Sequence, residues 1–137
     1  MLNSCIITQL PKFTDRRGDL TFIQNGPQLP FKIERLYYLY DVPAAAERGG
    51  HAHRNLHQLI IALSGSFEVR LYDGIQSGTY TLNKPYEALY VCPMIWRELY
   101  NFSSGSVTLV LASSLYDETD YIRNIDEYNL IAGQIRK

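Results

Sequence analysis

The sequence predicts an all-β protein, an antiparallel sandwich or barrel, with one helix near its C-terminal end. Three observations predict this class. Short runs rich in Val, Ile, Leu, Tyr and Phe recur at close spacing to about residue 113, separated by Gly, Pro, Asn or Asp. No helical pattern lies between these runs, which argues against a βαβ fold. Only the tail from Asp117 to Lys137 loses the alternation of apolar and polar residues.

Local signals justify each of the about eight to ten expected strands. The first β-prone run stops at Pro11, and the turn that follows contains Gly18, which tolerates a positive φ. Gly65 and Gly74 mark tight turns, and the run between them alternates apolar and polar side chains. Residues 42–50 are expected to form a loop. The expected strands are residues 5–10, 20–24, 33–41, 56–63, 67–72, 79–82, 88–92, 97–102 and 107–113.

The tail predicts the single helix. Its apolar residues recur at helical spacing and would form one face. They are Ile122, Ile125, Tyr128, Ile131 and Ile135. The sequence contains no linker, low-complexity stretch or solenoid repeat, so residues 1–137 are expected to form a single domain.

Composition excludes several classes of function. The net charge of −1 gives no general field for a polyanion, so we expect no nucleic-acid partner. The N-terminus has no basic segment followed by an apolar one, and no apolar run approaches membrane-spanning length. Cys5 and Cys92 are far apart and have no metal-type spacing. We therefore expect a reduced, cytoplasmic protein without a membrane partner.

The candidate site is centred on the histidines. All three, His51, His53 and His57, lie directly after Gly49-Gly50 and directly before an apolar run. On an extended segment, His51 and His53 would point to the same face, with Cα atoms about 6–7 Å apart. An imidazole pair of this kind suits either metal binding or proton transfer at neutral pH.

This stretch resembles the first motif of the cupins, with Gly before His-x-His, and residues 93–101 resemble the second motif. The resemblance implies a cupin-type double-stranded jelly-roll barrel. The motifs depart from the metal-binding pattern, because the glutamate position falls on His57 or Gln58 and Arg97 replaces the second-motif histidine. A guanidinium repels a divalent cation, so we expect no metal. A three-histidine site that includes His57 is the alternative.

A larger part of the chain resembles one narrower family, the dTDP-4-keto-6-deoxyglucose 3,4-ketoisomerases, the metal-free sugar-nucleotide cupins of bacterial surface-polysaccharide pathways. The similarity runs from about residue 3 to about residue 130 in one register. It is carried by Ile33–Tyr38, Arg48–His53, Tyr90–Glu98 and Tyr116–Arg123. The resemblance implies an isomerase that moves a carbonyl from C4 to C3 through an enediolate. The electrons stay within the substrate, so no cofactor is expected.

The resemblance also implies roles for individual residues. His51 would be the acid–base at carbon, His53 would relay a hydroxyl proton or orient the sugar, and Tyr37 would donate to a sugar oxygen. The motifs do not decide which histidine moves the carbon proton. Three arginines would bind sugar or diphosphate oxygens: Arg17, Arg48 and Arg97. Other arginines are expected to be surface or salt-bridge residues: Arg35, Arg54, Arg70 and Arg123.

Other aspects stay open at this point. Arg17 resembles the galacto-forming branch of the family and Arg97 the gluco-forming branch, so the configuration at C4 is undecided. No tyrosine can be chosen as the thymine-stacking residue. The resemblance implies a homodimer, with exchange of N-terminal strands as one arrangement. The rival functions are a cupin dTDP-deoxysugar 3,5-epimerase, a non-catalytic sugar-nucleotide-binding cupin, and a metal-dependent dioxygenase or isomerase.

Overall fold

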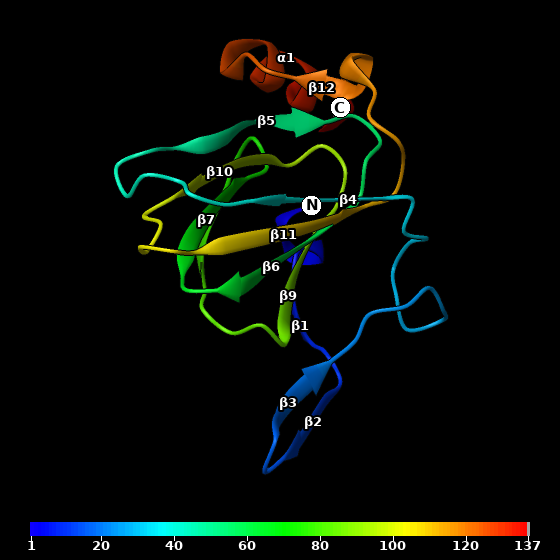
Figure 1. Ribbon diagram of the computed structural model, residues 1–137. Helices are drawn as coiled ribbons and strands as arrows, with labels where there is room; N and C mark the ends of the chain where they lie inside the picture. Colours follow the sequence, from blue (N-terminus) through cyan, green and yellow to red (C-terminus); the bar gives the residue numbers. More distant parts are fainter. Residues whose placement is uncertain (137) are drawn as a thin grey trace.

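Two five-stranded antiparallel sheets face each other in the computed structural model, which describes residues 1–136 (Figure 1). A separate two-stranded hairpin extends away from the sheets, and a C-terminal helix lies at the opposite end of the molecule. The all-β fold with a short terminal helix is confirmed. In the described part of the chain, neither the helix nor the short 3₁₀ turns are long and apolar enough to cross a membrane.

The first sheet has the strand order β1-β9-β6-β11-β4. Its strands pair antiparallel throughout, and β11 lies between β6 and β4. The strands are β1 (Ile7–Gln9), β4 (Arg35–Leu39), β6 (Gln58–Ser64), β9 (Glu87–Val91) and β11 (Val107–Ala112).

The second sheet has the order β12-β5-β10-β7-β8. It consists of β5 (Arg48–His53), β7 (Phe67–Tyr72), β8 (Ser77–Leu82), β10 (Trp96–Tyr100) and the two-residue β12 (Tyr121–Ile122). Helix α1 (Ile125–Arg136) packs beside this sheet through Tyr128 and Ala132, which belong to one buried cluster with Trp96. Strand β12, at the edge of this sheet, comes from the tail of the chain.

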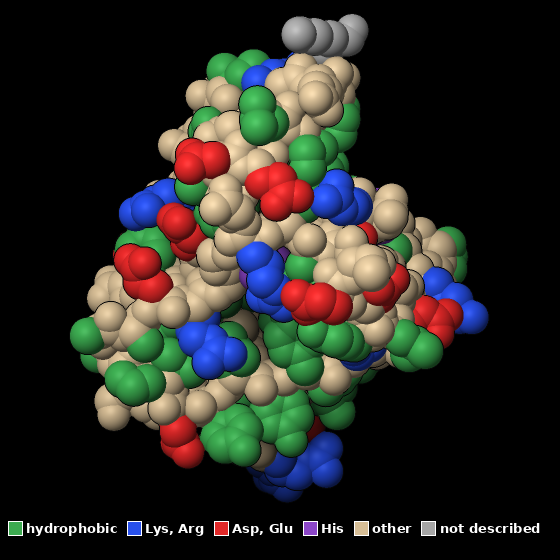
Figure 2. Space-filling model, turned by 90° about the horizontal axis from the view of Figure 1, so that it is seen from above, with side chains coloured by type: hydrophobic (Ala, Val, Ile, Leu, Met, Phe, Trp, Pro, Cys, Tyr) green, Lys and Arg blue, Asp and Glu red, His purple; other side chains and the backbone are tan. Residues whose placement is uncertain are grey.

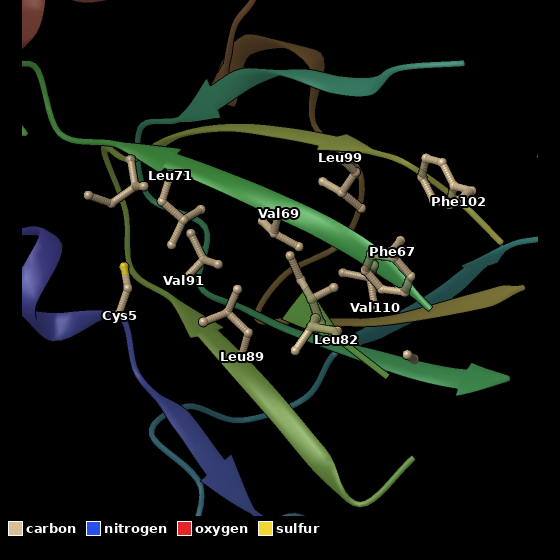
Figure 3. Packing of buried hydrophobic residues seen from close by; sticks show 13 residues of the cluster. Cys5, Phe67, Val69, Leu71, Leu82, Leu89, Val91, Leu99, Phe102 and Val110 are labelled. Carbon is tan, nitrogen blue, oxygen red and sulfur yellow. The ribbon is translucent and has the colours of Figure 1, made fainter. Parts of the chain in front are cut away.

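The main core fills the space between the two sheets, as Figure 3 shows. Alternation on β7 sends Phe67, Val69 and Leu71 inward, and each is at most 1% exposed. They meet inward residues of the facing sheet, among them Leu89 and Val110. This packing leaves one end of the space between the sheets for polar side chains.

The hairpin is formed by β2 (Lys12–Asp15) and β3 (Gly18–Thr21). Gly18 has φ +130° in its turn, as the sequence predicts. In Figure 1 the hairpin projects away from both sheets. Its apolar side chains Phe13 and Leu20 are both 58% exposed, so they are not covered by their own chain.

The observed elements differ from the expected ones in three places. A strand at Lys12–Asp15 was not expected, and β5 begins at Arg48, inside the expected loop. The helix begins at Ile125, so the prediction that Ile122 lies on it was wrong. Ile122 is instead buried on β12, because its strand pairs with β5 before the helix starts. Ile135 lies on the helix, as its spacing predicts, and is 58% exposed.

Candidate active site

Strand pairing places the histidines beside Arg97. In the β5–β10 register His51 lies opposite Arg97, and directly opposed residues of an antiparallel pair share a face. His53 is on the same face two residues later, with Tyr121 of β12 opposite it. Gly49 has φ +77°, and a Cβ there would lie 3.2 Å from the Leu99 side chain, which explains the glycine before the histidine motif.

The two histidines and Asp120 form a continuous hydrogen-bonded chain. His51 Nε2 lies 3.1 Å from His53 Nε2, and His53 Nδ1 lies 2.9 Å from Asp120 Oδ2. The other carboxylate oxygen, Asp120 Oδ1, accepts the backbone N–H of Asn55 at 2.7 Å. The Tyr121 ring packs against both imidazoles, with centroid distances of 4.9 Å and 4.3 Å. Both rings are therefore fixed in orientation.

This chain sets the tautomers. A carboxylate only accepts hydrogen bonds, so His53 Nδ1 carries a proton and donates it to Asp120. Neutral His53 then accepts at Nε2 from the N–H of His51 Nε2. As a result, His51 keeps its unprotonated lone pair on Nδ1 and is a base at that atom.

Burial keeps both imidazoles neutral. Burial lowers the pKa of His51 to about 2, with further lowering from the Arg97 guanidinium and from His53. Burial, then Arg97 and Arg35, lower the pKa of His53 to about 2. A neighbouring carboxylate such as Asp120 favours the charged imidazole, yet the pKa of His53 is lowered, with burial as the largest cause and the Arg97 guanidinium next. Both rings therefore start as neutral bases at physiological pH.

Arg97 is a buried cation that lacks a carboxylate partner within the described residues. It is 2% exposed, donates from Nη1 to Gln58 Oε1, and donates from Nη2 to the Ile95 carbonyl at 2.9 Å. Its Nε has no partner in that part of the chain. Gln58 Nε2 donates to the Tyr37 hydroxyl at 3.2 Å. These side chains form a polar wall that carries a net positive charge.

These walls enclose a cavity of about 380 Å³. Arg48 lies at its mouth, together with Arg35 and Arg123. Arg123 is held by two hydrogen bonds to Glu118 and lies 4.1 Å from the centre of the Tyr121 ring. In Figure 2 the face seen from above is hollowed, with Lys or Arg side chains at the edge and a small area of histidine beside one of them. A cationic mouth of this kind suits an anionic ligand.

The structure brings together most of the predicted site residues. His51, Tyr37, Arg48 and Arg97 line the cavity. His53 is fully buried behind His51 and reaches the cavity through it.

Arg17 and His57, which the sequence also suggested for the site, lie outside the cavity. The Arg17 side chain is 85% exposed at the hairpin turn, is paired with Asp15 at 2.8 Å, and does not line the cavity of its own chain. His57 packs against Phe31 and Tyr90 instead of His51, so the three-histidine alternative is wrong. In residues 1–136, no group of three or more His, Cys, Asp or Glu side chains is arranged to hold a metal.

Sequence reasoning missed several residues of the site. Asp120 and Gln58 were not assigned roles, although the first orients His53 and the second contacts Arg97 and Tyr37. Arg35 and Arg123 were expected to be surface or salt-bridge residues, and both line the cavity, while Arg123 also makes the expected salt bridge. The signal for Gln58 was its place at the cupin glutamate position. Asp120 lies within Tyr116–Arg123, one of the segments that carry the family resemblance, and that segment was the signal for it.

Comparison with known proteins gives consistent matches. Residues 3–133 match the family model described as "FdtA: WxcM-like, C-terminal". The TDP-4-oxo-6-deoxy-α-D-glucose-3,4-oxoisomerase of Aneurinibacillus thermoaerophilus is 42% identical over 129 residues, which cover 94% of this chain and 93% of the relative.

Two solved structures are similar over almost their whole length. One is a histidine-to-asparagine mutant of the 3,4-ketoisomerase QdtA from Thermoanaerobacterium thermosaccharolyticum in complex with TDP-4-keto-6-deoxyglucose. It has a TM-score of 0.94 and 41% identity, with 98% of this chain and 97% of that chain covered. The other is the TDP-quinovose 3,4-ketoisomerase WlaRB from Campylobacter jejuni, with a TM-score of 0.88, 44% identity, and coverage of 92% and 97%.

Proposed function

The chain belongs to the FdtA (WxcM-like, C-terminal) family, and we propose that it is a sugar-nucleotide 3,4-ketoisomerase. Its substrate is dTDP-4-keto-6-deoxyglucose and its product is a dTDP-3-keto-6-deoxyhexose, the precursor of a 3-amino-3,6-dideoxy sugar. The observation that carries this proposal is the Asp120–His53–His51 chain, with both imidazoles neutral, beside the Arg97 cation, which has no carboxylate partner in residues 1–136. A base next to a buried cation suits proton abstraction that creates an oxyanion.

The reaction is a pair of proton transfers within one substrate. The C4 ketone acidifies the hydrogen on C3, and His51 Nδ1 removes that hydrogen as a proton, which leaves an enediolate across C3 and C4. A proton returned to C4, with the O3 proton passed to O4, gives the 3-keto sugar. Atoms and electrons balance within the substrate, so the reaction needs no redox cofactor.

The buried wall stabilises the intermediate. Arg97 supplies a fixed positive charge, and the Tyr37 hydroxyl supplies a donor beside the developing oxyanion. Burial raises the pKa of Tyr37, which keeps its hydroxyl protonated as a donor. Preorganised donors of this kind contribute about 10²–10³-fold each to turnover.

His53 and Asp120 act through His51. When His51 gains a proton at Nδ1, its Nε2–H can be shared with His53 and the charge approaches Asp120. His53 is thus a positioning and relay residue rather than a direct sugar ligand. At the mouth, Arg48 lies with Arg35 and Arg123, and their guanidinium groups bind the diphosphate.

The direct test is to incubate the protein with dTDP-4-keto-6-deoxyglucose in D₂O and to identify the product by NMR. A ketoisomerase gives a 3-keto sugar without deuterium at C5, whereas a 3,5-epimerase places deuterium at C5. Unchanged substrate with tight dTDP binding would support a non-catalytic binding protein. A parallel reaction in H₂O keeps hydrogen at C4, and its coupling to H5 distinguishes the galacto from the gluco product. This result decides whether the product follows the branch that Arg17 resembles or the branch that Arg97 resembles.

The enzyme works as a homodimer in which the β2–β3 hairpin of one copy delivers Arg17 to the cavity of the other. The support is the exposed apolar surface of the hairpin, with Phe13 and Leu20 uncovered, and the distance of Arg17 from the cavity of its own chain. Exposed apolar surface of this extent favours an interface between copies.

Sedimentation measures the dimer, and subunit mixing tests the delivery of Arg17. Co-expression of Arg17→Ala with His51→Asn should restore part of the turnover that each variant lacks, because one of the two sites in the mixed dimer is intact. No restoration, when both single variants are inactive, would place Arg17 outside the partner's site. The reaction takes place in the cytoplasm, where Cys5 and Cys92, with Sγ atoms 3.8 Å apart, stay reduced.

A further inference from the structure

Gln58 connects the two donors of the buried wall. It is the first residue of β6 and is 1% exposed, and its amide lies between Arg97 and Tyr37. Arg97 Nη1 donates to Gln58 Oε1, and Gln58 Nε2 donates to the Tyr37 hydroxyl at 3.2 Å. The Gln58 amide therefore accepts a hydrogen bond at its oxygen and donates one from its nitrogen.

The chemistry of the neighbours fixes the direction of these hydrogen bonds. A guanidinium has only donors, so the atom of Gln58 that faces Arg97 must be its carbonyl oxygen. The amide nitrogen then faces Tyr37, whose oxygen must act as the acceptor. The hydroxyl proton of Tyr37 has to point elsewhere. Residues 1–136 offer it no hydrogen-bond acceptor, and Tyr37 lines the cavity.

We propose that Gln58 is a positioning residue that turns the Tyr37 hydroxyl proton into the cavity, towards the substrate oxygen on which negative charge develops. This inference rests on the proposed ketoisomerase function. The neutral amide has a second effect, because it holds Arg97 without cancelling its charge. Gln58 thus supplies the direction of one donor and preserves the cation beside it.

A glutamate at this position would reverse both effects. Its carboxylate accepts from Arg97 and neutralises the cation, and it also accepts from Tyr37, so the hydroxyl proton turns away from the cavity. Gln58→Glu is nearly isosteric, which makes it a sharp test. Gln134→Glu, on the exposed face of α1, is the matched control with the same change of charge.

We expect Gln58→Glu to lower kcat about 10²-fold or more, with KM and dTDP affinity changed less than about threefold. The added carboxylate also opposes the Arg97 charge that lowers the pKa of His51, so the acid limb of kcat/KM, which lies below pH 5 in the wild type, moves to higher pH. A purely structural role would not move this limb. Tyr37→Phe should cost about tenfold or more in the wild type and less than about twofold in Gln58→Glu, because the proton is already misdirected there.

Gln58→Met is the second variant if Gln58→Glu fails to fold by circular dichroism. It removes both hydrogen bonds without adding charge, so kcat should fall while the acid limb stays in place. Wild-type kcat in either folded variant, or additive losses with Tyr37→Phe, would overturn the inference alone. Absence of ketoisomerase turnover in the wild type would overturn the proposed function and this inference with it.

Discussion

The inward faces of β6 and β10 carry both the core and the site. Along β6 the inward positions are Gln58, Ile60 and Ala62, and along β10 they are Arg97 and Leu99. One end of each strand is polar and lines the cavity, whereas the rest is apolar and packs between the sheets (Figure 3). The same alternation of side chains produces both. The apolar core thus closes the cavity on one side and excludes water from the polar end. Burial at that end lowers the pKa of both histidines.

The largest effect should come from removal of the base, which should abolish activity and leave the core intact. His51→Asn should lower kcat by about 10³-fold or more, because no other group can take the C3 proton at that position. The affinity for dTDP and the free energy of unfolding should change little, since the cationic mouth and the core are intact. Turnover is measured by NMR and dTDP binding by calorimetry.

His57→Asn is the matched control for that experiment. It makes the same chemical change on a histidine that packs against Phe31 and Tyr90, outside the cavity. It should keep wild-type kcat. Near-normal turnover in His51→Asn would refute the assignment of the base.

Removal of the buried cation should separate activity from stability. Arg97→Met should lower kcat about 10²–10³-fold, because the oxyanion loses its fixed charge. The same change should alter the free energy of unfolding by less than about 2 kcal/mol, because relief of the buried charge is offset by loss of the hydrogen bonds to Gln58 and to the Ile95 carbonyl. Kinetics and urea denaturation measure the two effects. Arg70→Met, which breaks an exposed pair with Glu98 on β10, is the control and should keep kcat.

The Asp120 carboxylate should matter less than the base that it orients. Asp120→Asn should lower kcat about 10²-fold, because an amide can donate to His53 Nδ1 and thereby permit the wrong tautomer. KM should stay within about threefold of wild type. Asp126→Asn, in the exposed first turn of α1, should keep both parameters. A loss of folding in Asp120→Asn, seen by circular dichroism, would instead assign Asp120 a structural role.

The pH dependence should show the effect of burial directly. The pKa values of His51 and His53 are lowered to about 2, so neither should produce an acid limb in kcat/KM between pH 5 and 8. Unfolded histidines titrate near pH 6.5, so below that pH the unfolded state binds more protons than the folded state. Stability should therefore be complete above about pH 6.5 and fall as the pH drops towards 2, by at most about 1.4 kcal/mol per pH unit for each ring. A limb near pH 6.5 that His51→Asn removes would contradict the burial of the pair.

A change at the apolar end should affect stability alone. Phe67→Ala should cost about 3–5 kcal/mol in the free energy of unfolding, because Phe67 is 1% exposed and stacks on Phe102. At a temperature well below the unfolding transition, kcat should remain within about twofold of wild type. A large loss of kcat in the folded variant would show that the two ends are coupled.

Local patterns predicted much of this arrangement. A period of two predicts that His51 and His53 share a face, and turn residues predict most strand limits within a few residues. Arg97 was found by its place in the second cupin motif, which the β5–β10 register now sets opposite His51. These features depend on residues close in sequence or on motifs of fixed spacing.

The local sequence pattern could not predict features that depend on pairing between strands far apart in the sequence. Asp120 meets His53 from 67 positions away, because β12 pairs with β5. The helical spacing that includes Ile122 pointed to the wrong element, since two strand residues have too little period to be recognised. Arg35 looked like a surface charge because apolar and polar residues alternate only partly along residues 33–41. In each case the partner strand, rather than the residue itself, decides the role.

The pairing of β12 with β5 has a consequence for biosynthesis. All strands of the first sheet, and β5, β7, β8 and β10 of the second, lie before residue 113, so most of the core is already synthesised at that stage. The orienting carboxylate and the ring that holds both imidazoles arrive only with residues 120 and 121. A chain cut short by a premature stop codon near residue 115 would keep its apolar interior but lack both of these residues, so catalytic competence requires synthesis at least through residue 121.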